Sequence, residues 1–377
     1  MALLSAVNRI FFGSAFVLLL CTVGAVLWGR LRFFPLLHPR KTLRALGGGG
    51  ENFRSLTLAL AGTLGVGNIV GVSAAIHYGG AGALFWMWIS AFCMMPVKYA
   101  EIYLSVRLRE KRDDGWHGGP MYYMPHAFRN NRVGKSAAIF FAVLCLFASF
   151  FLGNLIQIRA AASGAAQLFD LPAFLTAALM LSAALFLIFC DREKLTAFTS
   201  FAIPVLCVGY LALCIWVLLC CRERLPQVMR QIFADAFSFR AAAGGVGGTL
   251  FFAALRQGCA KGVFSHEGGC GTAPISYAGA PGADPVKTGV WGMLEIFVDT
   301  VLLCTLTGLV LLVTPKQTGA WGSFSQVAEA FGSVCGVWGE RFIGAAVIVF
   351  AFSTLVCWSF YGAECIRWFT PAKGALT

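Results

Sequence analysis

Three glycines and an asparagine interrupt an apolar run, and these groups suit the binding of a small cation or a carboxylate. The run extends from Leu56 to Ile76 and contains Gly62, Gly65, Gly67 and Asn68. Irregular backbone survives in hydrocarbon only where it faces protein or a wet cavity, because unpaired polar groups are costly there. Backbone amides at a half-helix N-terminus suit a carboxylate, whereas carbonyls and the Asn68 oxygen suit a sodium ion. The alternative is that the glycines only let a neighbouring helix pack closely.

A second apolar stretch, from Gly258 to Tyr277, is interrupted in the same way. It reads GCAKGVFSHEGGCGTAPISY, with glycines and polar side chains inside an otherwise apolar segment. Paired interruptions in corresponding positions of two halves indicate a transporter built from inverted repeats, with its binding site between them. Four predicted spans separate the two stretches, which is the number that a five-helix repeat would leave. This correspondence favours broken helices over packing glycines.

The composition predicts helices that cross a membrane. Of 377 residues, 58% are hydrophobic and only 12% are charged, whereas soluble domains carry about 25% charged residues. The apolar runs have helical length and lack the short alternation of a barrel, so the predicted class is an all-α polytopic membrane protein. Nine spans are expected, at residues 9–29, 55–78, 81–107, 136–163, 171–190, 195–221, 249–278, 288–313 and 336–362.

The net charge of +12 is explained by topology and does not predict a nucleic-acid partner. Basic residues fill the loops at 30–54 and 108–135, which share one face of the membrane, as the positive-inside rule expects for the cytoplasm. This assignment also places the C-terminus in the cytoplasm and residues 222–248 outside, as an amphipathic connector. The first span is expected to be retained, because no small-residue cleavage site follows it. The cysteines show no metal-type pairing, so neither a disulfide framework nor a zinc site is predicted.

Several separate motifs resemble those of the alanine or glycine:cation symporter family. They cover most of the chain between about 55 and 365, and they are Gly62–Ile69, Phe85–Trp88, Lys98–Glu101, Gly118–Tyr123, Gly262–Gly268, Gly289–Glu295, Ala351–Thr354 and Trp358. The resemblance implies a leucine-transporter-type five-plus-five inverted repeat preceded by one extra N-terminal helix. It also implies symport of small neutral amino acids with sodium or protons by alternating access, in a prokaryotic cell membrane and with no cofactor.

The expected domains follow from that resemblance, with two departures from the family pattern. They are an extra helix and basic loop (1–54), a first repeat (55–221), the connector (222–248) and a second repeat (249–377). His266 and Gly268 stand where the family motif has Asn and Ala, and the imidazole would alter the cation site or make it pH-sensitive. The family carries two more helices after the span at 336–362, so the second repeat is expected to be incomplete. A truncated, transport-inactive remnant is therefore the alternative reading.

The expected site residues come from both interrupted stretches and from two other spans. Those expected to contact substrate are Gly65, Gly67, Asn68, Gln157, Phe264, Ser265, Gly268, Thr354 and Trp358. Those expected to bind sodium are Asn68, Ala351, Ser353 and Thr354, with Asp299 and His266 in reserve for coupling. The open alternatives are an interhelical hydrogen bond for Gln157, and bonding of Ser353 and Thr354 to the preceding helical turn.

Two pairs of charged residues lie close together within the predicted spans. Lys98 and Glu101 lie three residues apart on one helix face and are expected to form a structural or gating ion pair. Glu295 and Asp299 are four apart and are not expected to lie ionised against each other.

The five histidines are dispersed, so no enzyme is predicted. No repeated pore-loop pattern indicates a channel.

Overall fold

The computed structural model describes residues 14–46, 50–113, 115–189, 192–238, 250–315 and 322–370, and these are almost entirely helical. The exception among them is a short antiparallel hairpin of β1 (Glu110–Arg112) and β2 (Gly115–His117). The all-α class predicted from composition is confirmed. Residues 9–13 of the first predicted span and residues 239–248 of the predicted connector lie outside the described ranges.

Most helices of the first part of the chain fall where apolar runs occur, whereas the short α4 is basic. They are α2 (Ser14–Arg30), α3 (Phe34–Leu37), α4 (Pro39–Leu46), α5 (Gly50–Thr63), η1 (Gly67–Gly71), α6 (Val72–Gly79), α7 (Gly82–Arg107), α8 (Pro120–Ala127), α9 (Asn131–Phe150), η2 (Phe151–Leu155), α10 (Ile156–Phe169), α11 (Ala173–Phe189) and α12 (Arg192–Cys220).

The second part contains the surface helix, the second broken helix and two long helices. They are η3 (Arg222–Arg224), α13 (Leu225–Ala236), α14 (Leu250–His266), α15 (Ala273–Ala278), α16 (Pro285–Ile296), η4 (Phe297–Cys304), α17 (Thr305–Val313) and α18 (Phe324–Phe369), the last kinked at Gly336. Within the predicted connector, Leu225–Ala236 forms α13, which buries Val228, Ile232 and Ala236.

Within the described residues, five helical stretches are long and apolar enough to cross a membrane, or six if a bent pair counts as one span. The bent pair joins Leu56–Thr63 to Gly67–Gly79 at 52°, so the first interrupted stretch is a broken helix. The predicted spans at 9–29, 171–190 and 249–278 are occupied by helices that fall short of that criterion, so nine spans remains a prediction.

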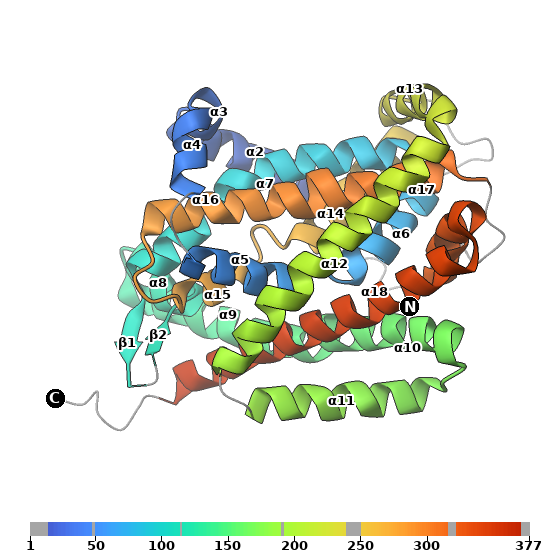
Figure 1. The fold of residues 1–377 in the computed structure, drawn as a ribbon. Helices are drawn as coiled ribbons and strands as arrows, with labels where there is room; N and C mark the ends of the chain where they lie inside the picture. Colours follow the sequence, from blue (N-terminus) through green and yellow to red (C-terminus); the bar gives the residue numbers. More distant parts are fainter. Residues whose placement is uncertain are drawn as a thin grey trace, which may run out of the picture.

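The broken helices lie in the middle of the bundle. Figure 1 shows α5, α6 and α15 between α7 and α16 on one side and α18, α9 and α10 on the other. Glycines make the closest approaches possible, because a Cβ on Gly258 would lie 2.3 Å from the Ala83 carbonyl oxygen of α7. Both sequence readings of the glycines therefore apply, with packing glycines inside α14 and chain-breaking ones after it.

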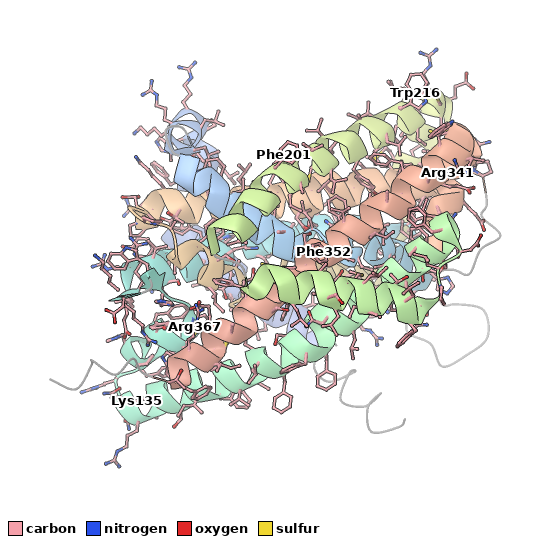
Figure 2. The ribbon with its side chains drawn as sticks, turned by 60° about the horizontal axis from the view of Figure 1, so that its bottom comes forward. Lys135, Phe201, Trp216, Arg341, Phe352 and Arg367 are labelled. Carbon is pink, nitrogen blue, oxygen red and sulfur yellow. The ribbon has the colours of Figure 1, made fainter. Side chains whose placement is uncertain are left out.

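The outer face of the bundle is apolar, and the charged side chains gather at its ends. Figure 2 labels Phe201 and Trp216 on α12, both of them exposed. Lys135 and Arg367 lie at one end of the molecule in that view, and Arg341 lies at the other. An apolar belt between charged ends suits a bilayer.

Candidate functional site

The two interrupted stretches meet at the centre of the bundle. η1 packs against α14 and η4, and a Cβ on Gly67 would lie only 3.3 Å from the Ser265 Cα. After α14 the chain turns through left-handed backbone at Glu267, Gly269 and Gly271, with φ of 51°, 81° and 75°. That conformation suits glycine, which has no Cβ to clash. The side chains of Asn68 and Ser265 both face η4.

Asp299 is the centre of a buried polar cluster that both stretches share. Its carboxylate accepts hydrogen bonds from Asn68 Nδ2 at 2.7 Å, Ser265 Oγ at 2.8 Å and Thr300 Oγ1 at 2.7 Å. Asn68 also donates to the Asp299 carbonyl oxygen at 3.0 Å, and Cys304 Sγ lies 3.2 Å from Ser265 Oγ. Asn68 and Asp299 both lie in π-helical turns, which occur frequently at functional sites.

This cluster is rich in hard oxygen atoms, and none of the described cationic side chains forms an ion pair with Asp299. The Asn68 Oδ1 atom is buried and has no hydrogen-bond partner, and Asp299 is fully buried. A buried polar atom without a partner and a buried carboxylate without a cation both cost free energy. A small cation among these oxygens would satisfy both groups.

A very small cavity adjoins the cluster. It is lined by Leu64, Gly65, Asn68, Ile69, Tyr210, Leu303 and Phe350. Its volume is about 10 Å³, which is room for about one water-sized species. The space has room for an ion or a water molecule, and a larger solute would fit there only after neighbouring helices move.

Gln157 and Thr354 complete a second set of polar groups at the helix break. Gln157 Oε1 accepts from the Val66 backbone N–H at 3.1 Å, an amide in the broken part of the helix. Thr354 Oγ1 lies 3.1 Å from the Ala61 carbonyl oxygen, 3.4 Å from that of Leu64 and 2.9 Å from that of Phe350. One hydroxyl proton serves only one acceptor at a time, so a cation would find free oxygen atoms here.

Ser353 and Ala351 are buried on the same helix, but the serine turns back on its own chain. Its Oγ donates to the Phe350 carbonyl oxygen at 2.9 Å, which is the helical back-bonding that the sequence left open as the alternative. Thr354 makes the same bond and also faces α5. The two hydroxyls are therefore unequal candidates for a cation ligand.

The remaining expected residues lie around this centre and not in it. The Phe264 ring is 36% exposed, with the Lys261 ammonium 5.7 Å from its centroid. The His266 Nδ1 accepts from the Gly268 N–H at 3.0 Å, and its Nε2 has no partner. Trp358 Nε1 donates to Glu267 Oε1 at 3.1 Å, so Glu267 sits in a hydrogen-bond network.

A second buried network holds a charge pair. Lys98 Nζ lies 2.7 Å from Glu295 Oε1 and also donates to the His266 carbonyl oxygen at 2.8 Å. Thr63 and Tyr277 hydroxyls donate to the same carboxylate at 3.3 and 3.1 Å. The predicted Lys98–Glu101 pair is wrong, because Glu101 instead accepts from the Gly269 N–H at 3.2 Å.

The hairpin after α7 fixes the far ends of α15 and α18. Arg109 Nη1 donates to the carbonyl oxygens of Ala278 and Ala280 at 3.0 and 2.6 Å, next to the end of α15. Burial lowers the pKa of the Arg109 guanidinium, which nevertheless stays charged because its ordinary value is so high. His117 Nδ1 lies 2.7 Å from Glu364 Oε2 of α18.

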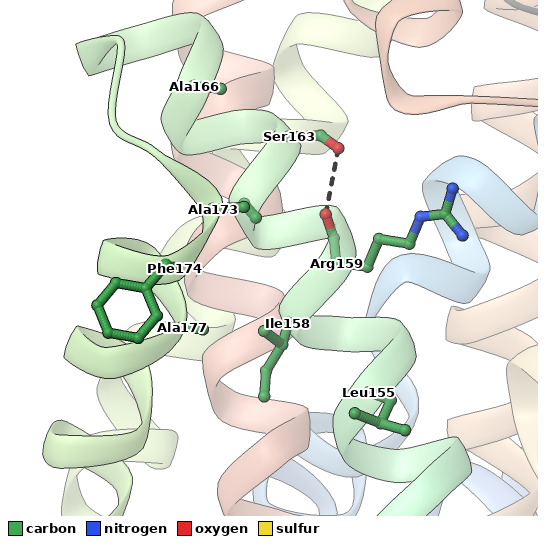
Figure 3. Close-up of a pocket in the computed structure, with 9 residues that line it drawn as sticks. Leu155, Ile158, Arg159, Ser163, Ala166, Ala173, Phe174 and Ala177 are labelled. Atoms are coloured by element: carbon green, nitrogen blue, oxygen red, sulfur yellow. Dashed lines mark hydrogen bonds between the residues drawn. The ribbon is translucent and has the colours of Figure 1, made fainter.

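A larger groove lies elsewhere, between α10 and α11. Its volume is about 550 Å³, and Figure 3 shows Leu155, Ile158 and Phe174 along its apolar wall. The Arg159 guanidinium extends away from α11 in that view. None of the expected site residues lines this groove. Size alone therefore does not identify the functional site.

Sequence reasoning missed several members of the central cluster. Cys304, Tyr210, Leu303 and Phe350 belong to none of the motifs that the sequence offers. Tyr210 OH lies 2.7 Å from Thr307 Oγ1, so it is a polar wall of the small cavity. The available signal was the polar side chains at 299, 300, 304 and 307, which recur at helical spacing.

Comparisons with known proteins agree with this arrangement. The sequence model of the sodium:alanine symporter family matches residues 1–377. An uncharacterized transporter of Haemophilus influenzae is 32% identical over 386 residues, which cover 99% of this chain and 83% of that protein. The sodium/alanine symporter AgcS of Methanococcus maripaludis is 32% identical over 391 residues, covering 99% and 84%. A mutant manganese transporter of Eremococcus coleocola shares the fold, with a TM-score of 0.57 and 16% identity over 85% of this chain and 67% of that one.

Proposed function

Since this chain belongs to the sodium:alanine symporter family, we propose that it carries a small neutral amino acid, such as alanine or glycine, together with sodium. The family is one of transporters and not of enzymes, and its long apolar helices make this chain a multi-pass membrane protein. We further propose a prokaryotic cell membrane, with the basic loops and the C-terminus in the cytoplasm.

The observation that carries the proposal is the uncompensated Asp299 cluster. A carboxylate, the free Asn68 Oδ1 and two hydroxyls converge from η1, α14 and η4 with no cationic side chain in contact. Sodium, as a hard cation, fits such an oxygen set. Both broken helices contribute, so binding of the ion would hold them in one relative position. A second sodium site would lie between Thr354 and the carbonyl oxygens of Ala61 and Leu64.

The amino acid would bind beside this ion, at the break in the first helix. The Val66 N–H is held by Gln157 Oε1, and a substrate carboxylate would replace that oxygen at a half-helix N-terminus. Room for the substrate exists because residue 65 is a glycine, since a side chain there would collide with Thr354 and Gln157. Phe264 and Trp358 would close around the substrate after movement of α14 and α18, which sets the preference for small side chains.

Two broken helices in the two halves also support an inverted repeat, with residues 55–221 and 249–377 as its members. Rocking of one repeat against the other would expose the site alternately to the two sides. His266 would influence coupling from the second break, where its imidazole lies between Gly268 and the chain turn.

Uptake of labelled alanine into proteoliposomes tests the proposal. We expect an inward sodium gradient to drive accumulation, and excess unlabelled alanine or glycine to compete. If only a proton gradient drove accumulation, the coupling ion would be the proton and not sodium. Absence of uptake and of exchange under every gradient would favour the transport-inactive alternative and overturn the symport proposal.

The Gly65→Ala variant tests the location of the substrate site. The new Cβ would lie 2.7 Å from Thr354 Oγ1 and 3.0 Å from Gln157 Oε1, so something must shift. Since overpacking costs about 1–3 kcal/mol, we expect alanine exchange to fall about tenfold or more. Gly29→Ala is the matched control, because its Cβ would meet no atom within 4 Å. Equal exchange by both variants would remove Gly65 from the site.

A further inference from the structure

The chain between the first two spans leaves the bundle through a strained corner. Arg32 and Phe33 follow α2 with φ of 50° and 49°, a left-handed conformation that costs non-glycine residues about 1–2 kcal/mol each. The Trp28 ring stacks on both Phe33 and Phe92, with centroids 5.4 and 5.0 Å apart, and its Nε1 donates to the Phe92 carbonyl oxygen. Trp28 is 1% exposed, so the corner is anchored to α7.

The helices α3 and α4 after this corner are held to each other. Thr42 Oγ1 lies 3.1 Å from the Pro35 carbonyl oxygen, and the Phe34 and His38 rings stack at 4.6 Å. In Figure 1 the pair stands out from the bundle beside the end of α2, with α4 running across the direction of α7 and α16. α4 packs against α16, and Leu46 at its end contacts the core. This geometry is that of a helix lying along the membrane surface.

The exposed part of this unit carries both basic and apolar side chains. On α4, Arg40, Lys41 and Arg44 share one side of the helix, the exposed Leu43 lies at the edge of that side, and Leu46 packs against the core. Leu37 and Leu43 are 68% and 66% exposed. No acidic residue occurs between 30 and 46, where Arg30 and Arg32 add two further exposed cations.

We propose that α3 and α4 form a docking surface for anionic phospholipid headgroups of the leaflet at this end of the bundle. The leucines and Phe34 enter the boundary between headgroups and acyl chains, and the guanidinium and ammonium groups bind lipid phosphates. Five cations next to a membrane span, without an acidic partner in sequence, match the charge of such lipids. The anchored corner at Trp28 and Phe33 keeps the helix at headgroup depth. The surface would tie the movement of α2 and α16 to the lipid composition.

The test reconstitutes the protein in phosphatidylcholine vesicles that contain a minority of phosphatidylglycerol. After mild detergent extraction, mass spectrometry measures the ratio of the two lipids that remain bound. We expect wild-type protein to enrich phosphatidylglycerol above the vesicle ratio. The variant Arg40→Gln/Lys41→Gln/Arg44→Gln should lose most of the enrichment, since each basic residue near the surface contributes about a fivefold preference.

A matched control separates this surface from general basicity. Arg129→Gln/Arg132→Gln/Lys135→Gln removes three exposed cations at the start of α9, one before the helix and two in its first turns, and it should keep the wild-type enrichment. A second variant, Leu37→Ser/Leu43→Ser, should lower the enrichment without a change in charge. The proposal would be overturned if the variant Arg40→Gln/Lys41→Gln/Arg44→Gln enriched phosphatidylglycerol as wild type does. It would also be overturned if the control variant lost as much of the enrichment. Because lipid binding is measured and not uptake, this result is independent of the symport proposal.

Discussion

Two carboxylates on consecutive turns of one helix have opposite environments. Glu295 in α16 faces the Lys98 ammonium at 2.7 Å, so its charge is compensated within the protein. Asp299 in η4 receives three side-chain hydrogen bonds from neutral donors and lies beside the unpartnered Asn68 Oδ1. Both are fully buried. The difference is that Glu295 has an ion-pair partner within the described residues, whereas Asp299 has only neutral hydrogen-bond donors, which is why we propose a cation there.

The same comparison explains how one helix serves structure and coupling. The Glu295 network joins Thr63 at the end of α5 to the last carbonyl of α14 through Lys98, and thus holds the two broken helices together. The Asp299 network joins the same helices through neutral groups that can exchange partners with an ion. If sodium binds at Asp299 as proposed, a fixed ion pair beside an exchangeable site would allow the two broken helices to rearrange with the ion.

The largest expected effect is the loss of stability in Lys98→Met. Removing one partner of a buried ion pair leaves the other charge uncompensated and costs about 3–5 kcal/mol. We expect a large fall in the unfolding temperature of the purified protein, measured by fluorescence in detergent. Lys98→Met/Glu295→Leu should recover most of that fall, since a hydrophobic pair avoids the stranded charge. If Lys98→Met is as stable as wild type, Glu295 is not compensated by Lys98.

An intermediate effect is expected for Asp299→Asn, and it concerns sodium more than stability. The amide keeps the shape of the carboxylate but loses the charge, and interactions with charged groups contribute about 1.5–3 kcal/mol. Sodium should therefore stop raising the unfolding temperature, and sodium-driven uptake should fall about tenfold or more.

Thr307→Val is the control for Asp299→Asn. It removes a buried hydroxyl, bonded to Tyr210 at 2.7 Å, from the next turns of the same helix without touching Asp299. Sodium should still stabilise this variant. If sodium stabilised Asp299→Asn as much as wild type, Asp299 would not be the carboxylate that binds sodium.

The smallest effects are expected from removing one neutral donor on each side. Thr63→Val deletes a 3.3 Å hydrogen bond to Glu295 and should cost about 1 kcal/mol of stability with the sodium requirement unchanged. Ser265→Ala deletes the bond to Asp299 and should raise the sodium concentration for half-maximal uptake about fivefold. The reverse pattern, with sodium dependence altered by Thr63→Val alone, would assign the cation to Glu295.

Much of the fold followed from the sequence because the bilayer restricts the choice. Apolar runs of helical length marked the spans, and the glycine interruptions marked the bend of 52° after Thr63 and the left-handed turn after His266. Boundaries were less accurate, since α18 extends from Phe324 to Phe369 where a span at 336–362 was expected. Its kink at Gly336 coincides with the predicted start.

Within the site, the sequence placed Asn68, Ser265, Gln157 and Thr354 at the centre and held Asp299 in reserve. The structure brings Asp299 to the middle of the cluster and leaves Phe264 partly exposed at its edge. Trp358 is engaged with Glu267. A helical repeat gives the face on which a residue lies, but the height at which another helix crosses that face depends on packing.

By itself the sequence determined the environment of this chain, its family motifs and the two places where helices break. Each of these depends on local chemistry, namely the hydropathy of a run and the conformational freedom of glycine. Only the tertiary structure decided that Lys98 pairs with Glu295 and not with Glu101, and that Asp299 forms no ion pair with any described residue. The partners of a buried charge come from other helices, and the energy of burial makes the nearest opposite charge in space decisive, however close another lies in sequence.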